Sequence, residues 1–391
     1  MKKNKLVYAF AIILAFGSCK KTMNVAPLVE QEMYASPFAG SNVAAFIEGT
    51  GTKAAFDRPY SMVVDDSGNL FVADGNTNGG NSRIRKVTPE GVTTTFAGGV
   101  IGSLDGTGTS AQFGDGGNVL TIDAQNNLYL ADQQNSCIRK ITPSGVVSTV
   151  AGAPGRANID GPVATAGIKF LSPADITIDP ANNIYFLDIK GIRKVSSTGI
   201  VSTPFPIASS NTFGPIATAT IANPTGITSD KAGNIYVATR PVNQSVVVKI
   251  GIDGIVSLYA GGPMDYNVNV QGPAARFGQL RTLSTDKSGN IYLVDAVYRT
   301  YLKIAADRFL SPLAGVPSKP LPSVLFGQGG PAFDVYFLDV QDIAIAPDGT
   351  IYVMENIPSS IRKIKLVDKA TTPPTQAEID KATWNKPGTW K

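Results

Sequence analysis

Residues 68–74 read GNLFVAD, a short apolar run that is entered from a Gly-Asn turn and ends in an acid. A turn followed by Val and an aromatic residue is typical of a β-strand. Close copies follow along the chain, at 126–132 (NNLYLAD), 182–188 (NNIYFLD), 233–239 (GNIYVAT), 289–295 (GNIYLVD) and 349–355 (GTIYVME). Successive copies are 51 to 60 residues apart. Such a period over most of a chain indicates a repeat fold.

Each repeat contains four strands, which we call a to d in chain order. Residues 60–99 split into four apolar runs, SMVVD, LFVAD, RIRKVT and VTTTFAG, separated by turns and polar loops. The short turns and the β-branched content predict an antiparallel meander. Six such units, each burying both faces against its neighbours, predict an all-β fold, a six-bladed β-propeller of four-stranded antiparallel blades.

The ring is expected to close through the N-terminal segment. The sixth unit has strands a, b and c, but DKATTPPTQ follows where strand d should lie. Residues 34–40 (YASPFAG) match strand d of the fifth unit, 309–315 (FLSPLAG), and 48–56 (EGTGTKAAF) repeat the linker 105–113 (DGTGTSAQF). We therefore predict that an N-terminal strand pairs with 361–366 and completes the last blade. An open solenoid is the alternative.

Blade one resembles the NHL repeat, a motif of six-bladed propellers found in many binding proteins and a few enzymes. The resemblance covers roughly residues 33–367 and is strongest in the first two units. It implies a propeller, but a propeller hosts many functions. The lyases of such propellers use histidine or zinc, whereas gluconolactonase-like propellers hold a cation with Glu, Asn and Asp.

The first 18 residues have the features of a secretory signal. Lys2, Lys3 and Lys5 precede an 11-residue apolar run, 6–16, that is too short to span a bilayer. FGSC, ending at Cys19, resembles a bacterial lipobox, which implies cleavage before Cys19 and acylation of its thiol. An ordinary signal peptide with an incidental cysteine is the alternative. Lys20 and Lys21 follow in place of acids, which favours the periplasmic side over the cell surface.

Composition excludes several functions. The chain has no histidine, so Ser-His-Asp and Cys-His catalysis and His-bound zinc are absent. Without the signal the net charge falls from +4 to +1, because three lysines and no acids are lost, and so we expect no nucleic acid partner. The two cysteines are Cys19 and Cys137, and a lipid on Cys19 leaves no disulfide. We interpret Cys137 as a small loop residue before IRK.

Strand parity predicts where a ligand binds. The d–a linkers and the b–c loops share one face, the loop-rich face, and they are longer and more varied than the a–b and c–d turns. Variable loops on a rigid scaffold usually carry binding. The polar candidates there are Arg58, Asn76, Asp115, Gln134, Asp175, Lys190, Asn223, Arg240, Arg281, Arg299, Asp342 and Asn356.

Acids close strand b in five units: Asp74, Asp132, Asp188, Asp295 and Glu355, with Thr239 in the fourth unit. Converging around a channel, they would bind a cation such as Ca²⁺. The competing interpretation is structural. Strand c carries an arginine in four of these units, at 85, 139, 193 and 362, and guanidinium groups suit carboxylates. We favour pairing within each blade.

The sequence thus predicts a signal peptide (1–18), a tether (19–32), the propeller (33–367) and a tail (368–391). We expect an exported, lipid-anchored protein of the bacterial envelope that binds a protein, peptide or glycan at its loop-rich face. It contacts the membrane through the lipid alone, and we expect no cofactor. A calcium ion in the central channel is the alternative. The alternatives are a cation-dependent hydrolase of the gluconolactonase kind and a structural envelope component.

Overall fold

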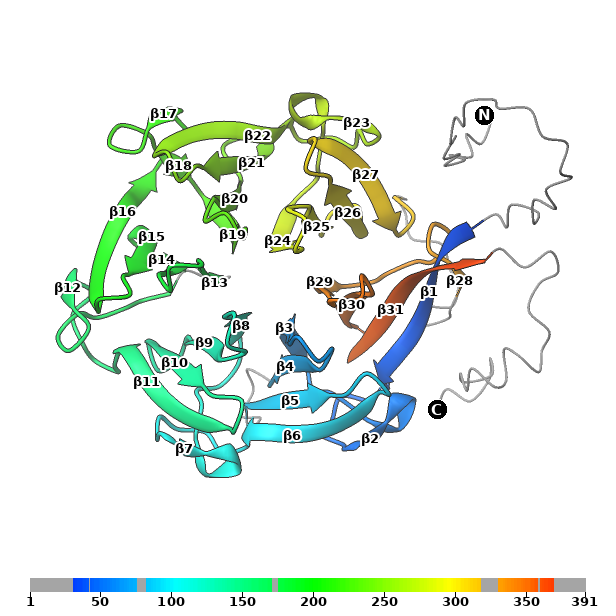
Figure 1. Ribbon diagram of the computed structural model, residues 1–391, viewed down its shortest axis with the longest axis horizontal. Helices are drawn as coiled ribbons and strands as arrows, with labels where there is room; N and C mark the ends of the chain where they lie inside the picture. Colours follow the sequence, from blue (N-terminus) through cyan, green and yellow to red (C-terminus); the bar gives the residue numbers. More distant parts are fainter. Residues whose placement is uncertain are drawn as a thin grey trace, which may run out of the picture.

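The computed structural model describes residues 31–41, 43–75, 82–170, 175–317, 330–357 and 359–368. Within these ranges six antiparallel sheets surround a central axis (Figure 1), so the predicted six-bladed β-propeller is confirmed. Among the described residues no helix is long and apolar enough to cross a bilayer. The signal peptide with Cys19, the loop residue Asn76 and most of the tail lie outside the described residues.

The strands of each blade follow one order from the channel outward. Blade 1 contains β3 (Pro59–Val64), β4 (Leu70–Asp74), β5 (Arg83–Val87), β6 (Val92–Gly98) and β2 (Gly49–Thr50). Blade 2 contains β8 (Val119–Ile122), β9 (Leu128–Asp132), β10 (Cys137–Ile141), β11 (Val146–Gly152) and β7 (Gly106–Thr107). Blade 3 contains β13 (Ile176–Ile178), β14 (Ile184–Asp188), β15 (Gly191–Val195), β16 (Ile200–Ala208) and β12 (Gly161–Pro162).

The second half of the ring repeats this order. Blade 4 contains β19 (Pro224–Ser229), β20 (Ile235–Thr239), β21 (Gln244–Ile250), β22 (Ile255–Pro263) and β17 (Gly214–Pro215). Blade 5 contains β24 (Leu280–Thr285), β25 (Ile291–Asp295), β26 (Thr300–Ile304), β27 (Phe309–Ala314) and β23 (Val270–Gln271). Blade 6 contains β29 (Val340–Ile345), β30 (Ile351–Asn356), β31 (Ser359–Asp368), β1 (Gln31–Gly40) and β28 (Gly330–Pro331).

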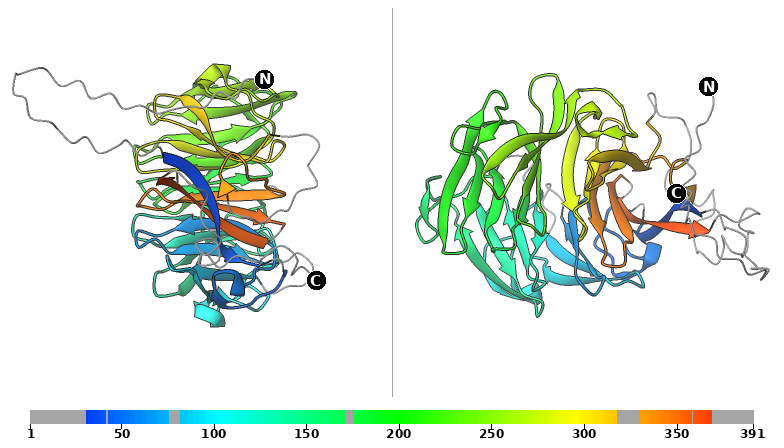
Figure 2. Two further views of the ribbon diagram at one scale, coloured as in Figure 1. Left: turned by 90° about the vertical axis from the view of Figure 1, so that its right-hand side faces the viewer. Right: turned by 45° about the horizontal axis from the view of Figure 1, so that its top comes forward.

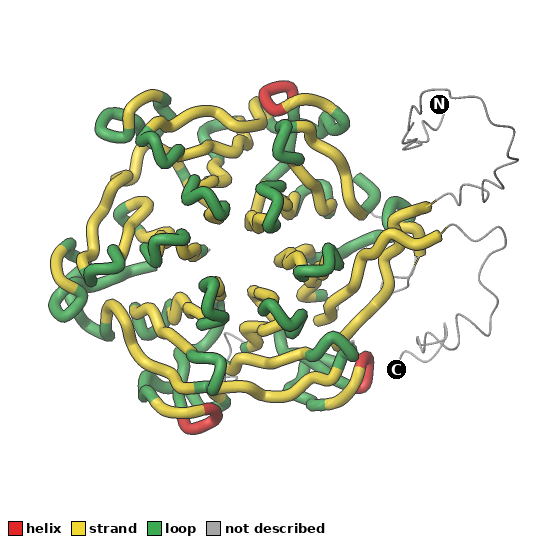
Figure 3. The backbone as a smooth tube through the Cα atoms, viewed as in Figure 1, coloured by secondary structure: helices red, strands yellow, loops and turns green. Residues whose placement is uncertain are grey.

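A two-residue fifth strand on each blade departs from the predicted four-stranded blades. In blade 1 it is β2, which pairs with β6 through Gly49↔Thr93 and Thr50↔Val92. The linker leaves the outermost strand of one blade and must pass the outer edge of the next blade before it turns inward, and there it adds this short pair. The 3-10 turns η1 (Gly51–Lys53), η2 (Gly108–Ser110) and η3 (Gly272–Ala274) follow three of these strands (Figure 3). The two-residue strand β18 (Ile221–Ala222) pairs in parallel with β16.

The N-terminal strand closes the ring as predicted. β1 runs antiparallel to β31, with Tyr34 opposite Lys365 and Gly40 opposite Ser360. Figure 2 shows β1 in blue beside β31 in red. β1 begins at Gln31, two residues before the predicted start of the propeller. Blade 6 therefore joins the two ends of the described chain.

The a–b turn explains the stretch GNLFVAD. The Asp65 carboxylate accepts the backbone N–H groups of Ser67 and Asn69, at 2.9 and 2.8 Å, and the Asn69 side-chain amide at 2.8 Å. Gly68 follows the turn with a φ of 81°, which favours glycine. Similar Asp-centred turns occur at 123, 179, 230 and 286. The turn therefore joins strands a and b in the same register in each of these blades, as in the pairs Val64↔Leu70 and Ile122↔Leu128.

Strand d of most blades ends in a glycine at positive φ. Gly152 at the end of β11 has a φ of 77°, and an added Cβ would lie 2.3 Å from the Ser136 carbonyl oxygen. The corresponding residues of blades 1, 4, 5 and 6 also have positive φ and close backbone neighbours: Gly98, Gly261, Gly315 and Gly40. The recurring Ala-Gly at the end of strand d is therefore required by a close backbone contact with the start of strand c.

Candidate functional site

The acids that close strand b form buried ion pairs with strand c. Arg85 lies 3.1 Å from Asp74, Arg139 lies 3.2 Å from Asp132, and Arg193 lies 3.2 Å from Asp188. Arg362 lies 2.8 Å from Glu355. The side chains of these pairs are at most 1% exposed, so the predicted pairing within blades is confirmed.

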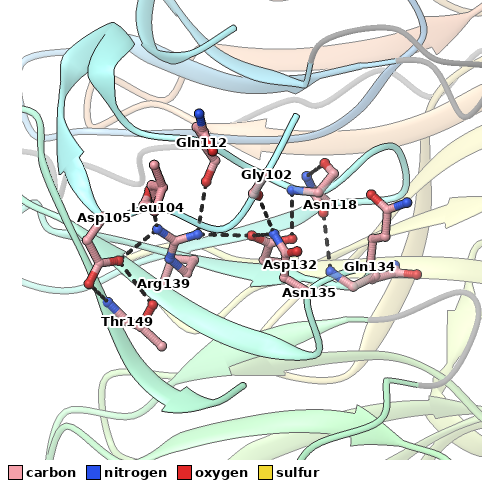
Figure 4. Close-up of polar contacts among 12 residues, drawn as sticks. Gly102, Leu104, Asp105, Gln112, Asn118, Asp132, Gln134, Asn135, Arg139 and Thr149 are labelled. Atoms are coloured by element: carbon pink, nitrogen blue, oxygen red, sulfur yellow. Dashed lines mark hydrogen bonds and ion pairs between the residues drawn. The ribbon is translucent and has the colours of Figure 1, made fainter. Parts of the chain in front are cut away.

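Three of these arginines, Arg85, Arg139 and Arg193, also bind the linker that enters their blade. Figure 4 shows this for blade 2. Arg139 donates to the carbonyl oxygens of Gln112 and Leu104, both at 3.0 Å, and to the Asp105 carboxylate at 2.7 Å. Asp132 in turn accepts the N–H of Gly114 at 3.0 Å. The pair therefore fastens the linker to the blade, which is a structural role.

The blades without this arginine satisfy the same position differently. In blade 5, where Leu302 replaces the arginine, Asp295 accepts four backbone N–H groups, from Gly278, Gln279, Val297 and Tyr298. In blade 4 the Thr239 hydroxyl donates to the Ala222 carbonyl oxygen. The five acids therefore lie inside the blades and do not converge on the channel. No group of three acids, histidines or cysteines that could hold a metal ion occurs in the described part of the chain.

Burial raises the pKa of three of these acids, Asp74, Asp132 and Glu355. Desolvation raises the pKa of Asp74 to about 7, although Arg85 opposes the shift. Burial likewise raises the pKa of Glu355, again against its arginine. Burial also raises the pKa of the Cys137 thiol to about 12. Cys137 begins strand β10 and is buried, so its predicted place in a loop is wrong.

A channel of about 710 Å³ follows the propeller axis. It is lined by the innermost strands β3, β8, β13, β19, β24 and β29, and by the a–b turns that follow them. These strands are the inner edges of their sheets, so their backbone N–H and C=O groups face the channel without a neighbouring strand. The cavity lies on the a–b turn side, opposite the loop-rich face that the sequence predicts as the binding face.

The channel wall differs between the two halves of the ring. Hydroxyl side chains line blades 3 to 5: Thr177, Thr228, Ser229, Ser284 and Thr285. Aliphatic residues predominate on blades 6, 1 and 2, at Ala344, Ile345, Val63, Val64 and Ile122, beside the hydroxyl residues Ser61 and Thr121. Hydroxyl pairs bridge neighbouring blades, since Thr177 Oγ1 lies 3.0 Å from Ser229 Oγ. The channel can therefore hold a ligand that has one polar and one apolar side.

A ring of six residues, which we call the channel ring, lies at the inner end of this cavity. It takes the same position in each innermost strand: Ser61, Val119, Asp175, Gly226, Thr282 and Asp342. Three of its members reach the next blade. Ser61 Oγ accepts the N–H of Leu120 at 3.1 Å. Asp175 accepts the N–H of Ile227 at 2.8 Å, and Asp342 accepts that of Met62 at 2.7 Å.

Asp175 directly precedes β13 of blade 3, and Asp342 lies in β29 of blade 6. The two strands lie on opposite sides of the axis (Figure 1). They are 6% and 7% exposed, and both line the cavity. Burial raises the pKa of Asp342 to about 6 and that of Asp175 well above its usual range, and the charge of Asp342 raises Asp175 further. The nearby Thr282 hydroxyl opposes the rise in both pKa values.

Several predicted loop residues meet beside the channel ring. Arg281 lies 3.5 Å from Asp339, whose carbonyl oxygen accepts the N–H of Asn356. Arg299 Nε donates to the Leu338 carbonyl oxygen at 3.0 Å. Arg281, Arg299, Asp342 and Asn356 therefore lie around the segment that enters blade 6.

The other predicted loop residues lie apart from this group. Asn223 donates to the Arg240 carbonyl oxygen at 3.2 Å, and Gln134 accepts the N–H of Asp115. Arg58 and Lys190 are exposed. Sequence reasoning missed Ser61, Thr282 and the hydroxyl residues that line the channel on blades 3 to 5. A signal existed in the alignment of the six strands a, where position 61 is polar in four units.

Comparisons with known proteins show the fold. No protein-family model matches the chain, so the resemblance to the NHL repeat stays a prediction. The chain is 27% identical to zebrafish (Danio rerio) teneurin-3 over 53% of its own length but 8% of that protein, so it spans less than a tenth of the curated relatives it matches.

Solved structures extend the likeness over most of the chain. A protein of unknown function from Bacteroides thetaiotaomicron has a TM-score of 0.63 at 18% identity, with 86% of this chain and 77% of that chain covered. An auxiliary nutrient binding protein from Bacteroides ovatus has a TM-score of 0.61 at 13% identity, with 86% and 78% covered. At these identities the shared feature is the propeller fold.

Proposed function

We propose that this protein is an exported, lipid-anchored binding module that takes a small polar molecule or a glycan unit into its axial channel. The observation that carries this proposal is the channel itself. Its volume of about 710 Å³ falls in the range of small-molecule sites, which is about 300–1,000 Å³. Unpaired strand edges and hydroxyls supply hydrogen-bonding groups, and the aliphatic half supplies apolar contact.

The likeness to the nutrient binding protein agrees with this proposal but does not carry it, because at 13% identity it extends to the fold alone. A protein or peptide partner at the loop-rich face is the broader expectation from the sequence. The channel favours a small ligand over that partner, since it is a concave site with polar groups around it. No specific observation favours the cation-dependent hydrolase.

The binding proposal is tested by filling the channel. Ser284 and Thr121 are half-buried and line the cavity, so Ser284→Phe and Thr121→Phe would occupy its space. Thr94 is exposed on the outer strand β6, and Thr94→Phe is the matched control. A panel of mono- and oligosaccharides and small polar metabolites is screened by thermal shift and confirmed by calorimetry.

We expect at least one compound of the panel to bind the parent chain and the Thr94→Phe variant alike. Its affinity should fall at least tenfold in both channel variants, with their melting confirming that they are folded. A compound that binds all four proteins equally would place its site outside the channel and overturn the proposal. A panel without any binder would do the same.

The lipid anchor is proposed from the lipobox-like FGSC ending at Cys19. Expression in a bacterium with a labelled fatty acid should label the parent chain and leave a Cys19→Ala variant unlabelled. The parent should fractionate with membranes after export. Equal labelling of both proteins would contradict acylation at Cys19.

A further inference from the structure

The two acids of the channel ring lie on opposite blades of the propeller. Asp175 precedes β13 in blade 3, Asp342 lies in β29 of blade 6, and both are buried. Both carboxyls also line the cavity. A group that enters the channel along its axis therefore meets both acids at once.

This pair differs from the buried acids that close strand b. Four of the acids on strand b have an arginine, and Asp295 has four backbone N–H groups. Within the described ranges neither Asp175 nor Asp342 has an ion-pair partner inside 4.0 Å. Two buried carboxylates that line one cavity and have no cationic partner do not both stay ionised, so the site holds either a proton or a cationic group.

Resting on the proposed function, we propose that the ligand carries a primary ammonium group, which binds in the channel ring between Asp175 and Asp342. An ammonium group has three donors and no acceptor. Asp175, Asp342 and the Ser61 hydroxyl offer oxygen acceptors on blades 3, 6 and 1 of the same ring. The rest of the channel then accommodates the remainder of the ligand against its hydroxyl and aliphatic halves.

The site fits an organic cation better than a metal ion. Each carboxyl already accepts two backbone N–H groups: Asp175 those of Ile176 and Ile227, Asp342 those of Ile343 and Met62. Calcium takes six to eight oxygen ligands, and two partly used carboxylates supply few of these. A cavity of about 710 Å³ also has room for a carbon skeleton behind the charged group.

The test compares simple probes on the purified full chain by ligand-observed NMR and calorimetry at pH 8. n-Butylammonium carries the proposed group, 1-butanol is its neutral counterpart, tetramethylammonium has the charge without N–H donors, and Ca²⁺ represents a metal. The protein variants are Asp175→Asn/Asp342→Asn, the single Asp342→Asn, and Asp253→Asn as an exposed control on a c–d turn.

We expect n-butylammonium to bind at least tenfold more tightly than the other three probes. Its affinity should fall at least tenfold in the double variant and stay unchanged in Asp253→Asn. Asp342→Asn alone gives the same readout if the double variant does not fold. Absence of n-butylammonium binding, equal affinity for 1-butanol, tighter binding of Ca²⁺, or full affinity in the asparagine variants would each overturn the ammonium site.

The outcome also separates this inference from the binding proposal. A saccharide from the panel that binds the parent chain and the Asp175→Asn/Asp342→Asn variant equally, but not Ser284→Phe, would leave the channel as a binding site and remove the ammonium group. If neither n-butylammonium nor any compound of the panel binds the parent chain, both the ammonium site and the binding proposal are overturned.

Discussion

Arg139 Nη1 lies 3.2 Å from Asp132 Oδ2, and neither side chain is exposed to solvent. Lys140, the next residue, is half-buried, and its ammonium lies 5.6 Å from the Tyr129 ring. The two basic residues are neighbours in sequence, yet strand alternation places them on opposite faces of β10. This difference in setting separates a structural arginine from a surface lysine.

Arg139→Ala should therefore lower the free energy of unfolding by roughly 3–5 kcal/mol, because it leaves Asp132 buried and unpaired. Lys140→Ala should cost at most about 1 kcal/mol. Urea unfolding of both variants, followed by far-UV circular dichroism, measures the difference. Equal, small shifts would contradict the structural role of the pair.

The backbone contact at the end of strand d predicts a second effect. Gly152→Ala forces a Cβ against the Ser136 carbonyl oxygen at a φ of 77°, so we expect a loss of at least about 2 kcal/mol. Gly155 has nearly the same φ, 75°, but an added Cβ meets nothing within 4 Å. Gly155→Ala should then cost only the left-handed penalty of about 1–2 kcal/mol. Thermal unfolding distinguishes them, and equal losses would show that the contact adds nothing.

Deleting residues 31–40 should destabilise the whole ring, because β31 would lose the strand it pairs with from Gln31 to Gly40. A synthetic peptide of that sequence, added in excess, should bind the truncated protein and restore its melting temperature. A peptide in which Tyr34 and Ala35 are replaced by proline is the control, since proline removes backbone donors from the pairing. A truncated chain that melts like the parent would disprove closure by β1.

The raised pKa of Asp342 predicts a pH effect of definite sign. The folded chain binds this proton up to about pH 6, whereas the free side chain loses it near pH 4, so its contribution to stability is present at low pH and lost as pH rises. Relative to Asp342→Asn, the parent should lose up to about 3 kcal/mol between pH 4 and 7. Urea unfolding at several pH values measures this.

The other charged or titratable groups near the channel ring are Asp175, Asp339, Arg281, Tyr60 and Tyr301. They are present in both proteins, but Asp342 also raises the pKa of Asp175, so the comparison measures Asp342 together with its effect on Asp175. Asp348 provides a control of opposite sign, because the Thr350 backbone N–H and nearby groups lower its pKa to about 2. Relative to Asp348→Asn, the stability of the parent should rise with pH through the acidic range. If the pH dependence had the same sign for both acids, the raised pKa of Asp342 would be refuted.

The repeat unit, the closing strand and the Arg–acid pairs could be predicted because each is written as a periodic signal. GNLFVAD and its copies mark strand b. The arginine of strand c follows the acid of strand b, as Arg85 follows Asp74 and Arg139 follows Asp132, and only the length of the loop between them differs. The outer strands could not be predicted in this way. They contain two residues each, and a pair as short as Gly49–Thr50 carries no pattern of alternation.

The channel ring was harder to predict for a different reason. Its six members are of five residue types, so no single chemistry repeats at this position, and Asp175 and Asp342 lie 167 positions apart in the sequence. The sequence places both among the loop-face candidates because each lies where a linker meets a strand. Only closure of six blades brings them together, which a repeat taken one unit at a time does not reveal.

The pairing of Ser36 with Lys363 joins residues 327 positions apart, and it sets an order of events during folding. The first described strand emerges early in synthesis and has no partner until nearly all of the chain exists. Bringing such distant segments together is entropically costly and slow. An incomplete chain would therefore carry two open strand edges, at β1 and β30, and both are templates for aggregation.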